Sequence, residues 1–254
     1  MKLRPSCWLL LLMLCSCASI APQVRDNDAA RAADAESAAR ESSPYDTGWV
    51  DTRQMLIPGV DVAGVRVRVF VPPGYDPGSR IGYPVLYLND GQDADAIALQ
   101  STLNALIASG DIAPTIAVAI DMPSDRMAAY GFSDRQAKRS LIAQTRYGAV
   151  GAQSQAYSEW LVNTLVPSID SDYRTRTRPD GRTILGWSLG AANALNIGWR
   201  YPEVFGRTGA FSPSLWLSSE RGNGNGDSDS DAVQRTRIAQ QMIASGEYRA
   251  GSRW

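Results

Sequence analysis

The residues best suited to covalent chemistry are residues 186–190, Gly-Trp-Ser-Leu-Gly, which match the pattern Gly-x-Ser-x-Gly. The pattern is short enough to occur by chance, so its setting decides its meaning. It follows a buried-strand pattern at 182–187 and opens a helical pattern from about Leu189 to Tyr201. A strand, a sharp turn and a helix in that order present a nucleophilic serine at the carboxyl edge of a sheet. We therefore predict that Ser188 is a catalytic nucleophile, with a serine that caps the helix as the alternative.

The helix after the serine also supplies a group that can stabilise negative charge. The first N–H groups of a helix have no acceptor within it, and the helix dipole favours an anion there. We expect the backbone N–H of Leu189 to face the oxyanion that forms when the serine attacks an ester. No cofactor or metal is needed for this chemistry, and we expect none.

The serine lacks its usual base, because the sequence contains no histidine. In this kind of site the chain order is serine, then an acid, then histidine. The residues after Ser188 are used by the helix, a strand at 206–211, a polar loop at 222–231 and a helix near 232–245. We therefore expect a fragment that lacks the strands carrying the acid and the base. The alternative is a protein that binds a ligand without hydrolysing it.

Other residue types offer little help to the serine. A lysine can act as the base in some hydrolases, but the chain has only Lys2, near its start, and Lys138, in a polar stretch. The aspartates at 227, 229 and 231 alternate as calcium ligands can, yet no EF-hand pattern surrounds them. We interpret them as part of a solvated loop.

Strand and helix patterns alternate before the serine motif. Residues 65–71 alternate apolar and charged side chains, as a half-buried antiparallel strand does, whereas 84–88, 115–120 and 182–187 have the continuous apolar character of strands buried on both faces. Helical spacing appears at 95–108 and at 152–166, where Pro167 marks the expected end. This order predicts an α/β fold of three layers around a mainly parallel sheet, C-terminally incomplete.

Several ordered segments resemble the enterochelin-esterase/esterase D-type family of α/β-hydrolases, which act on carboxylic esters. The resemblance runs from about Met55 to Trp216 and includes the serine motif. The other matching segments are Val-Pro-Pro-Gly-Tyr at 71–75, Tyr-Pro-Val-Leu-Tyr-Leu-Asn-Asp-Gly-Gln-Asp at 83–93, Ala-Ile-Asp at 119–121, Val-Pro-Ser-Ile-Asp at 166–170, Tyr-Pro-Glu-Val-Phe-Gly at 201–206 and Phe-Ser-Pro-Ser-Leu-Trp at 211–216.

The resemblance implies a three-layer α/β-hydrolase that takes a small-molecule ester. It implies a second oxyanion-hole donor from the loop at 90–92, the N–H of Gln92, beside that of Leu189. The alternative for Asp90 and Asp93 in this loop is that they are simple turn residues. The resemblance also implies that Arg126, Tyr130 and Trp216 line the substrate site. Their alternatives are a solvated charge, a core aromatic and a packing aromatic.

The N-terminus has the pattern of an exported lipoprotein. Lys2 and Arg4 precede an apolar run at 8–14 that is too short to span a bilayer, and the sequence Leu-Cys-Ser-Cys follows at 14–17. We expect a signal peptide at 1–17 and lipidation of Cys17, with ordinary cleavage near Ala18 or Ala21 as the alternative. In a Gram-negative cell, Ala18 directly after Cys17 favours an outer-membrane lipoprotein that faces the periplasm.

The net charge limits the partners that the protein can bind, and changes in composition divide the chain into segments. A formal net charge of −1 gives no basic field for nucleic acid, so the expected membrane contact is the lipid anchor alone. Residues 18–48 are rich in Ala, Ser, Asp and Arg and bury too little to order themselves, which predicts a flexible tether. The esterase domain is then expected at 49–254, and the oligomeric state stays open.

Overall fold

The computed structural model describes residues 48–220 and 236–245. The expected signal peptide, the lipidation site Cys17 and the tether therefore lie outside the described residues, as do the aspartates of the loop at 222–231. In the described part of the chain, no helix has both the length and the hydropathy needed to cross a bilayer.

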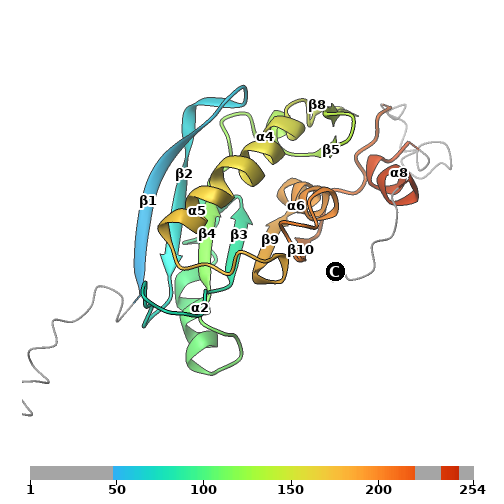
Figure 1. Cartoon of the computed structure of the whole chain (residues 1–254). Coiled ribbons are helices and arrows are strands. Elements are labelled where there is room, and N and C mark those ends of the chain that lie inside the picture. The colour runs from blue at the N-terminus through green and yellow to red at the C-terminus, as the bar shows by residue number, and fades with distance from the viewer. Residues whose placement is uncertain (1–47, 221–235, 246–254) are drawn as a thin grey trace, which may run out of the picture. The chain divides into compact units, whose positions relative to one another are not determined.

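A six-stranded sheet in the order β1-β2-β4-β3-β9-β10 forms the centre of the domain (Figure 1). Strands β1 and β2 pair antiparallel, and β2 also pairs antiparallel with β4. The pairs β4–β3, β3–β9 and β9–β10 are all parallel. The mainly parallel sheet predicted from the sequence is confirmed. Its strands are β1 (Trp49–Ile57), β2 (Asp61–Val71), β3 (Val85–Asn89), β4 (Ile116–Ile120), β9 (Arg182–Trp187) and β10 (Arg207–Phe211).

Helices and short turns connect these strands, and two small hairpins lie between β4 and the helix α4. The helical elements are η1 (Gly91–Asp93), α2 (Leu99–Ala108), α3 (Arg126–Ala129), α4 (Ser154–Trp160), η2 (Leu161–Leu165), α5 (Val166–Asp172), η3 (Pro179–Gly181), α6 (Ser188–Arg200) and α8 (Ile238–Ser245). The hairpin strands are β5 (Phe132–Asp134), β6 (Arg139–Leu141), β7 (Ala143–Thr145) and β8 (Gly148–Val150).

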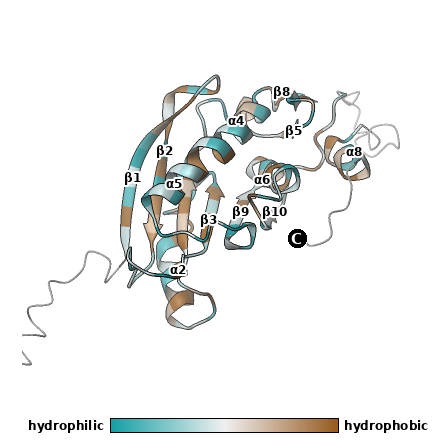
Figure 2. Ribbon diagram, in the orientation of Figure 1, coloured by the Kyte–Doolittle hydropathy of each residue, from teal (hydrophilic) through white to brown (hydrophobic). Residues whose placement is uncertain are grey.

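Two separate hydrophobic clusters cover the two faces of the sheet. Side chains of successive residues in a strand point to opposite faces, and β3 shows this directly. Tyr87 belongs to the cluster that contains Leu161 and Ile197 of η2 and α6, whereas Leu88 belongs to the cluster that contains Leu99 of α2. Figure 2 shows the hydrophobic colour concentrated on the central strands. The three-layer arrangement follows from these two clusters.

The structure corrects two expectations drawn from the sequence. The helix expected to end at Pro167 continues to Asp172, because a π-helical turn, η2, precedes the proline. In a π-helical turn each N–H donates to the fifth preceding carbonyl, and here the N–H of Val166 donates to the carbonyl of Leu161. This wider turn accommodates Pro167, which has no N–H. In addition, the strand β1 was not expected from the sequence. Its residues alternate between exposed and partly buried, and its pairing with β2 holds them extended.

The carboxylate of Asp61 fixes the loop that leads into α3. It accepts hydrogen bonds from the backbone N–H groups of Ala63, Gly64 and Ser124, at 3.0, 3.1 and 2.7 Å. These bonds, with that of Ser124 first, hold the pKa of Asp61 below its ordinary value of 3.8 although burial opposes them. The loop from 121 to 125 is thereby tied to the start of β2.

Asp61→Asn should therefore lower stability in a pH-dependent way. The folded protein prefers the ionised carboxylate, so the stabilisation is fully present above pH 3.8 and is lost as the pH falls through the lower folded-state pKa. At pH 7 the variant should lose about 1–3 kcal/mol of unfolding free energy, the typical worth of a hydrogen bond to a charged group. Urea unfolding at several pH values measures this. Asp180→Asn, at an exposed carboxylate, is the control, and equal losses in both variants at every pH would contradict the prediction.

Candidate active site

Ser188 lies at the junction between β9 and α6 in an uncommon backbone conformation. Its φ is 54°, in the left-handed region that non-glycine residues rarely adopt, while the preceding Trp187 is extended. The serine is exposed, and among the described residues no hydrogen-bond partner of its hydroxyl is found. Residues held in such conformations cluster at functional sites. The strand–turn–helix setting predicted for this serine is present.

The two glycines of the motif are required because other atoms lie where their side chains would be, backbone atoms at Gly186 and a carboxylate at Gly190. A Cβ atom at Gly186 would lie 2.5 Å from the carbonyl carbon of Gly190, and one at Gly190 would lie 2.4 Å from Oδ2 of Asp90. Both distances are shorter than real Cβ contacts allow. The first contact lets the helix fold back directly onto the end of β9. The second brings the loop after β3 against the first turn of α6.

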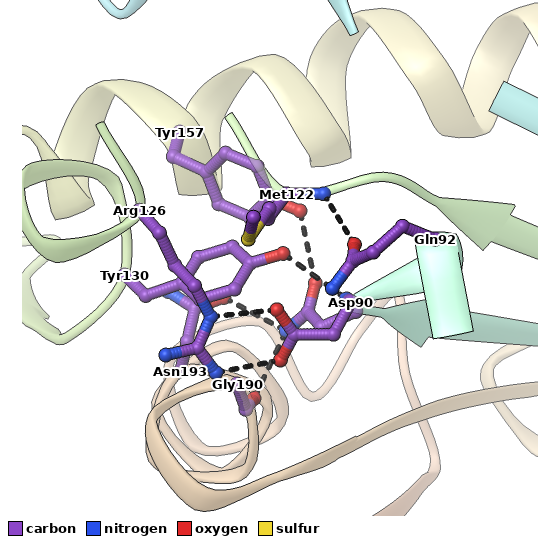
Figure 3. A network of polar contacts seen from close by, with 9 residues as sticks. Asp90, Gln92, Met122, Arg126, Tyr130, Tyr157, Gly190 and Asn193 are labelled. Carbon is purple, nitrogen blue, oxygen red and sulfur yellow. Dashed lines mark hydrogen bonds and ion pairs between the residues drawn. The ribbon is translucent and has the colours of Figure 1, made fainter. Parts of the chain in front are cut away.

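Two backbone N–H groups at this junction are free to donate. Leu189 is the second residue of α6, so its N–H has no acceptor within the helix. Within the described chain, the N–H of Gln92 in η1 also has no acceptor. The side chain of Gln92 is held separately, because its Oε1 accepts a hydrogen bond of 2.9 Å from the N–H of Met122 (Figure 3). The loop that carries Gln92 touches the serine turn through the contact between Asp90 and Gly190.

A buried amide network joins the end of β3 to α6 (Figure 3). Nδ2 of Asn89 donates to the Gly190 carbonyl at 3.0 Å and to Oδ1 of Asn193 at 3.1 Å, and the Tyr157 hydroxyl donates to Oδ1 of Asn89 at 2.9 Å. Asn89, Tyr157 and Asn193 are all fully buried. Buried amides must be hydrogen-bonded, so this network fixes the position of the first turn of α6 relative to β3.

Asp90 and Arg126 form a two-point ion pair next to this network. Nε of Arg126 donates to Oδ1 of Asp90 at 2.7 Å, and Nη2 donates to Oδ2 at 2.8 Å. The Asp90 side chain is 1% exposed and that of Arg126 is 27% exposed. The hydrogen bonds with Asp90, more than any other interaction, raise the pKa of Arg126. Asp90 is therefore a buried carboxylate with an ionic partner, which is more than a simple turn residue would show.

Tyr130 lies beneath the same loop. It is fully buried, and its hydroxyl accepts a hydrogen bond of 3.2 Å from the N–H of Asp90. Burial, and then the negative charge of Asp90, raises the pKa of Tyr130 well above its ordinary value. Tyr130 is thus an aromatic residue of the core, which was the alternative to a contact with substrate. A contact between Tyr130 and substrate stays a prediction.

The loop after β10 brings exposed apolar side chains toward the serine. The N–H of Ser214 donates to the Ser188 carbonyl at 3.1 Å, which ties residues 212–216 to the serine turn. Phe211, Leu215 and Trp216 are 59%, 38% and 57% exposed. Trp216 is thus exposed two residues after Ser214, which is bonded to the serine turn, and its role in substrate binding stays a prediction.

No described residue provides the missing base. Lys138 is exposed at the turn between β5 and β6, where its φ of 50° places it in the left-handed region. Among the described residues, no cluster of three or more Asp, Glu, His or Cys side chains could hold a metal ion. The described residues therefore bring together an exposed serine and two backbone N–H groups without a histidine.

Sequence reasoning missed the residues that hold the site together. Asn89 follows a buried strand, and Asn193 and Asn196 recur at helical spacing among small apolar residues of α6. An amide side chain at the end of a strand buried on both faces could have indicated a buried hydrogen-bond network, because a buried amide requires partners. The partners themselves come from a distant helix, which no local pattern indicates.

Comparison with known proteins gives a family match over most of the domain. The model of a family described as "Putative esterase" matches residues 63–247. The bifunctional endo-1,4-beta-xylanase/feruloyl esterase of Xylanibacter ruminicola is 28% identical over 163 residues, covering 60% of this chain and 20% of the relative. An uncharacterized protein of Bacillus subtilis, YbbA, is 25% identical over 154 residues, covering 61% of this chain and 58% of the relative. The matches thus span less than two thirds of these curated relatives.

Solved structures show the same fold at low sequence identity. An enterochelin esterase from Shigella flexneri superposes with a TM-score of 0.56 at 18% identity, covering 80% of this chain and 43% of that one. A ferulic acid esterase superposes with a TM-score of 0.55 at 21% identity, covering 78% of this chain and 71% of that one. The predicted α/β-hydrolase type of fold is confirmed.

Gly190→Ala should disturb the site through the buried carboxylate of Asp90. The added Cβ would lie 2.4 Å from Oδ2 of Asp90, which Arg126 holds in place, so the loop or the helix must move. Overpacking of this kind typically costs about 1–3 kcal/mol of unfolding free energy. Chemical denaturation measures the loss. Gly78→Ala, whose Cβ would meet only Asp76 in an exposed turn at 3.2 Å, is the control. An unchanged midpoint for Gly190→Ala would contradict the described packing.

Proposed function

Because the chain belongs to the esterase family, we propose that it acts on carboxylic esters and that Ser188 is the nucleophile. The observation that carries this proposal is the backbone of Ser188 itself, exposed at a φ of 54° between β9 and α6. A serine that only capped the helix would need no left-handed backbone, since capping residues are typically extended. The strained turn instead raises the hydroxyl above the edge of the sheet.

The proposed reaction has two halves. Oγ of Ser188 attacks the ester carbonyl, its proton passes to a base, and the N–H groups of Leu189 and Gln92 stabilise the oxyanion. The tetrahedral intermediate then collapses, the C–O bond to the alcohol breaks, and the alcohol leaves with a proton. Water next attacks the acyl-enzyme, which releases the acid and restores the serine.

The base is the component that this sequence does not contain. With no histidine in the chain and Lys138 at an exposed hairpin turn, we propose that the base comes from outside the 254 residues. In the absence of the base, oxyanion stabilisation alone still gives roughly 10³–10⁴-fold acceleration over water in serine hydrolases whose triad has been removed. Slow ester hydrolysis is therefore expected of this chain by itself, and because this residual rate does not require the serine, the reactivity of Ser188 has to be measured separately.

The surroundings of the serine favour an ester with an apolar acyl group. Leu215 and Trp216 expose apolar surface on the loop tied to the Ser188 carbonyl, and Phe211 is exposed at the end of β10, directly before that loop. Aromatic side chains contribute large apolar contact areas with fixed geometry. The name of one relative, a feruloyl esterase, describes an ester of an aromatic acid and supports this choice.

A second candidate function follows from the missing histidine. Without a base, the site can bind an ester or an acid and leave it unchanged. Such a binding protein would keep the oxyanion donors and the apolar loop, but Ser188 would react with nothing. The two functions differ in one measurable property, the reactivity of the serine hydroxyl.

Ser188→Ala should abolish covalent labelling by a neutral alkyl fluorophosphonate, whereas p-nitrophenyl acetate should still be hydrolysed at the residual rate that the oxyanion donors give without the serine. Both reagents place a developing negative charge at the oxyanion donors, so the unaltered chain should be labelled once and should release nitrophenol slowly. Intact mass spectrometry and absorbance measure the two reactions. The matched control is Ser101→Ala, at an exposed serine of α2.

The results separate the two functions. Labelling lost in Ser188→Ala and kept in Ser101→Ala supports the esterase. Binding of ferulate to the unaltered chain without any labelling of Ser188 supports the binding protein. Equal labelling of the unaltered chain and Ser188→Ala would refute the role of this serine.

A further inference from the structure

We propose that Asp90 and Arg126 are positioning residues, which hold the loop that carries the oxyanion donor Gln92 against the serine turn. The proposal rests on the proposed function of Ser188 and adds a role for a pair of residues that do not themselves contact substrate. It replaces the direct substrate contact that the family resemblance implied for Arg126. Four observations on the loop at 90–95 carry it.

The first observation is the isolation of the Asp90 carboxylate from solvent. Its side chain is 1% exposed, and both oxygens are bonded to Arg126 at 2.7 and 2.8 Å. A buried charge is tolerated only with a partner of good geometry, and a two-point pair between arginine and carboxylate meets that requirement. Asp90 also has a φ of 59°, so the backbone at the start of the loop is held in a strained form.

The second observation is that this carboxylate touches the serine turn directly. Position 190 must be glycine because Oδ2 of Asp90 occupies the space beside it. The carboxylate therefore acts as a spacer between the oxyanion loop and the first turn of α6. A shift of Asp90 changes the distance between the N–H of Gln92 and the N–H of Leu189.

The third observation is a second arginine on the same loop. Arg68 of β2 is buried, and its Nη2 donates to the Gly91 carbonyl at 2.6 Å while its Nη1 donates to Asp95 at 2.8 Å. The loop is thus held by Arg126 at Asp90 and by Arg68 at Gly91. Arg68 holds the first residue of η1 through its backbone carbonyl and Asp95 through its side chain, and Arg126 holds the end of the loop nearest the serine.

The fourth observation concerns the geometry of Arg126 itself. Nε and Nη2, the edge that best matches a carboxylate, are both used by Asp90 (Figure 3). Its guanidinium also lies 5.3 Å from the ring centre of Tyr130, whose hydroxyl accepts from the N–H of Asp90. Arg126, Tyr130 and Asp90 therefore form one unit, and releasing Arg126 to bind a substrate anion would leave Asp90 buried without its ionic partner.

The two roles of Arg126 predict different kinetics. A positioning residue affects the transition state, so its loss lowers kcat for every ester and leaves KM nearly unchanged. A residue that binds a substrate anion affects an anionic ester alone and acts mainly on KM. A positioning pair also requires Asp90 and Arg126 to act together, so the double variant should be no worse than either single variant.

The test uses Asp90→Asn, Arg126→Gln and the double variant of the full chain. The substrates are p-nitrophenyl acetate, which is neutral, and p-nitrophenyl hemisuccinate, which is anionic. Asp170→Asn is the matched control, because Asp170 pairs with the buried Arg182 at the start of β9, at the opposite end of that strand from Ser188. Thermal unfolding of each variant separates a general loss of stability, which the control shares, from a local effect.

Each single variant should lower kcat by about 10- to 100-fold on both esters, somewhat less than the loss of a whole oxyanion donor. KM should change by no more than about twofold. Amide hydrogen exchange provides an independent measurement of the loop. The N–H groups of Asp90, Asp93 and Ala94 are hydrogen-bonded in the unaltered chain, and they should exchange about tenfold faster in both variants but not in Asp170→Asn.

Three results would overturn the proposal. The first is a kcat for the acetate ester that is unchanged in Asp90→Asn. The second is a higher KM for the hemisuccinate alone in Arg126→Gln, and the third is unchanged exchange in the loop. Failure of the proposed function looks different, because fluorophosphonate labelling would then be equal in the unaltered chain and Ser188→Ala. Amide exchange would in that case still decide whether the pair holds the loop.

Discussion

The structure depends on the close approach of β9 and the first turn of α6, which is possible only because residues 186 and 190 have no side chain. This contact turns the chain sharply enough to leave Ser188 exposed with a left-handed backbone. A left-handed conformation is unfavourable for serine, so the surrounding packing must maintain it. Parallel pairing of β9 with both β3 and β10 holds the strand on two sides and supplies that support.

The polar groups beside this turn explain why the loop after β3 lies where it does. Asn89, Asp90 and Asn193 are fully or almost fully buried, although burial of a polar group without a partner costs several kcal/mol. Each therefore has a partner on another element: the carbonyl of Gly190, the guanidinium of Arg126 and the carbonyl of Gly131. These requirements couple β3, α3 and α6. A change in one element consequently alters the position of the groups that surround the serine.

Much of the fold was predictable because its strands and helices carry strong local patterns. The apolar runs of β3, β4 and β9 predicted a parallel sheet, and the glycines around Ser188 predicted the turn. The strand β1 escaped prediction because only pairing with β2 holds it extended. The continuation of α4 through Pro167 escaped as well, because the π-helical turn depends on the packing of that helix rather than on the proline. The partners of Asp90 and Asn89 are separated from them by about 36 to 104 positions along the chain, beyond any local pattern.

Strand β3 has a further consequence for the integrity of the site. Its residues alternate between the two hydrophobic clusters, with Tyr87 on one face and Leu88 on the other, and the strand ends at Asn89. Its pairing with β4 places Asn89 opposite Ile120, and its pairing with β9 places Leu88 opposite Leu185. A slip of one residue would send each side chain to the opposite face. Tyr87 would then have to fit into the smaller cluster beside α2, and Asn89 would turn away from α6. The size of Tyr87, a residue distant from Ser188 in the sequence, thus disfavours a shifted register of β3 and keeps Asn89 facing α6.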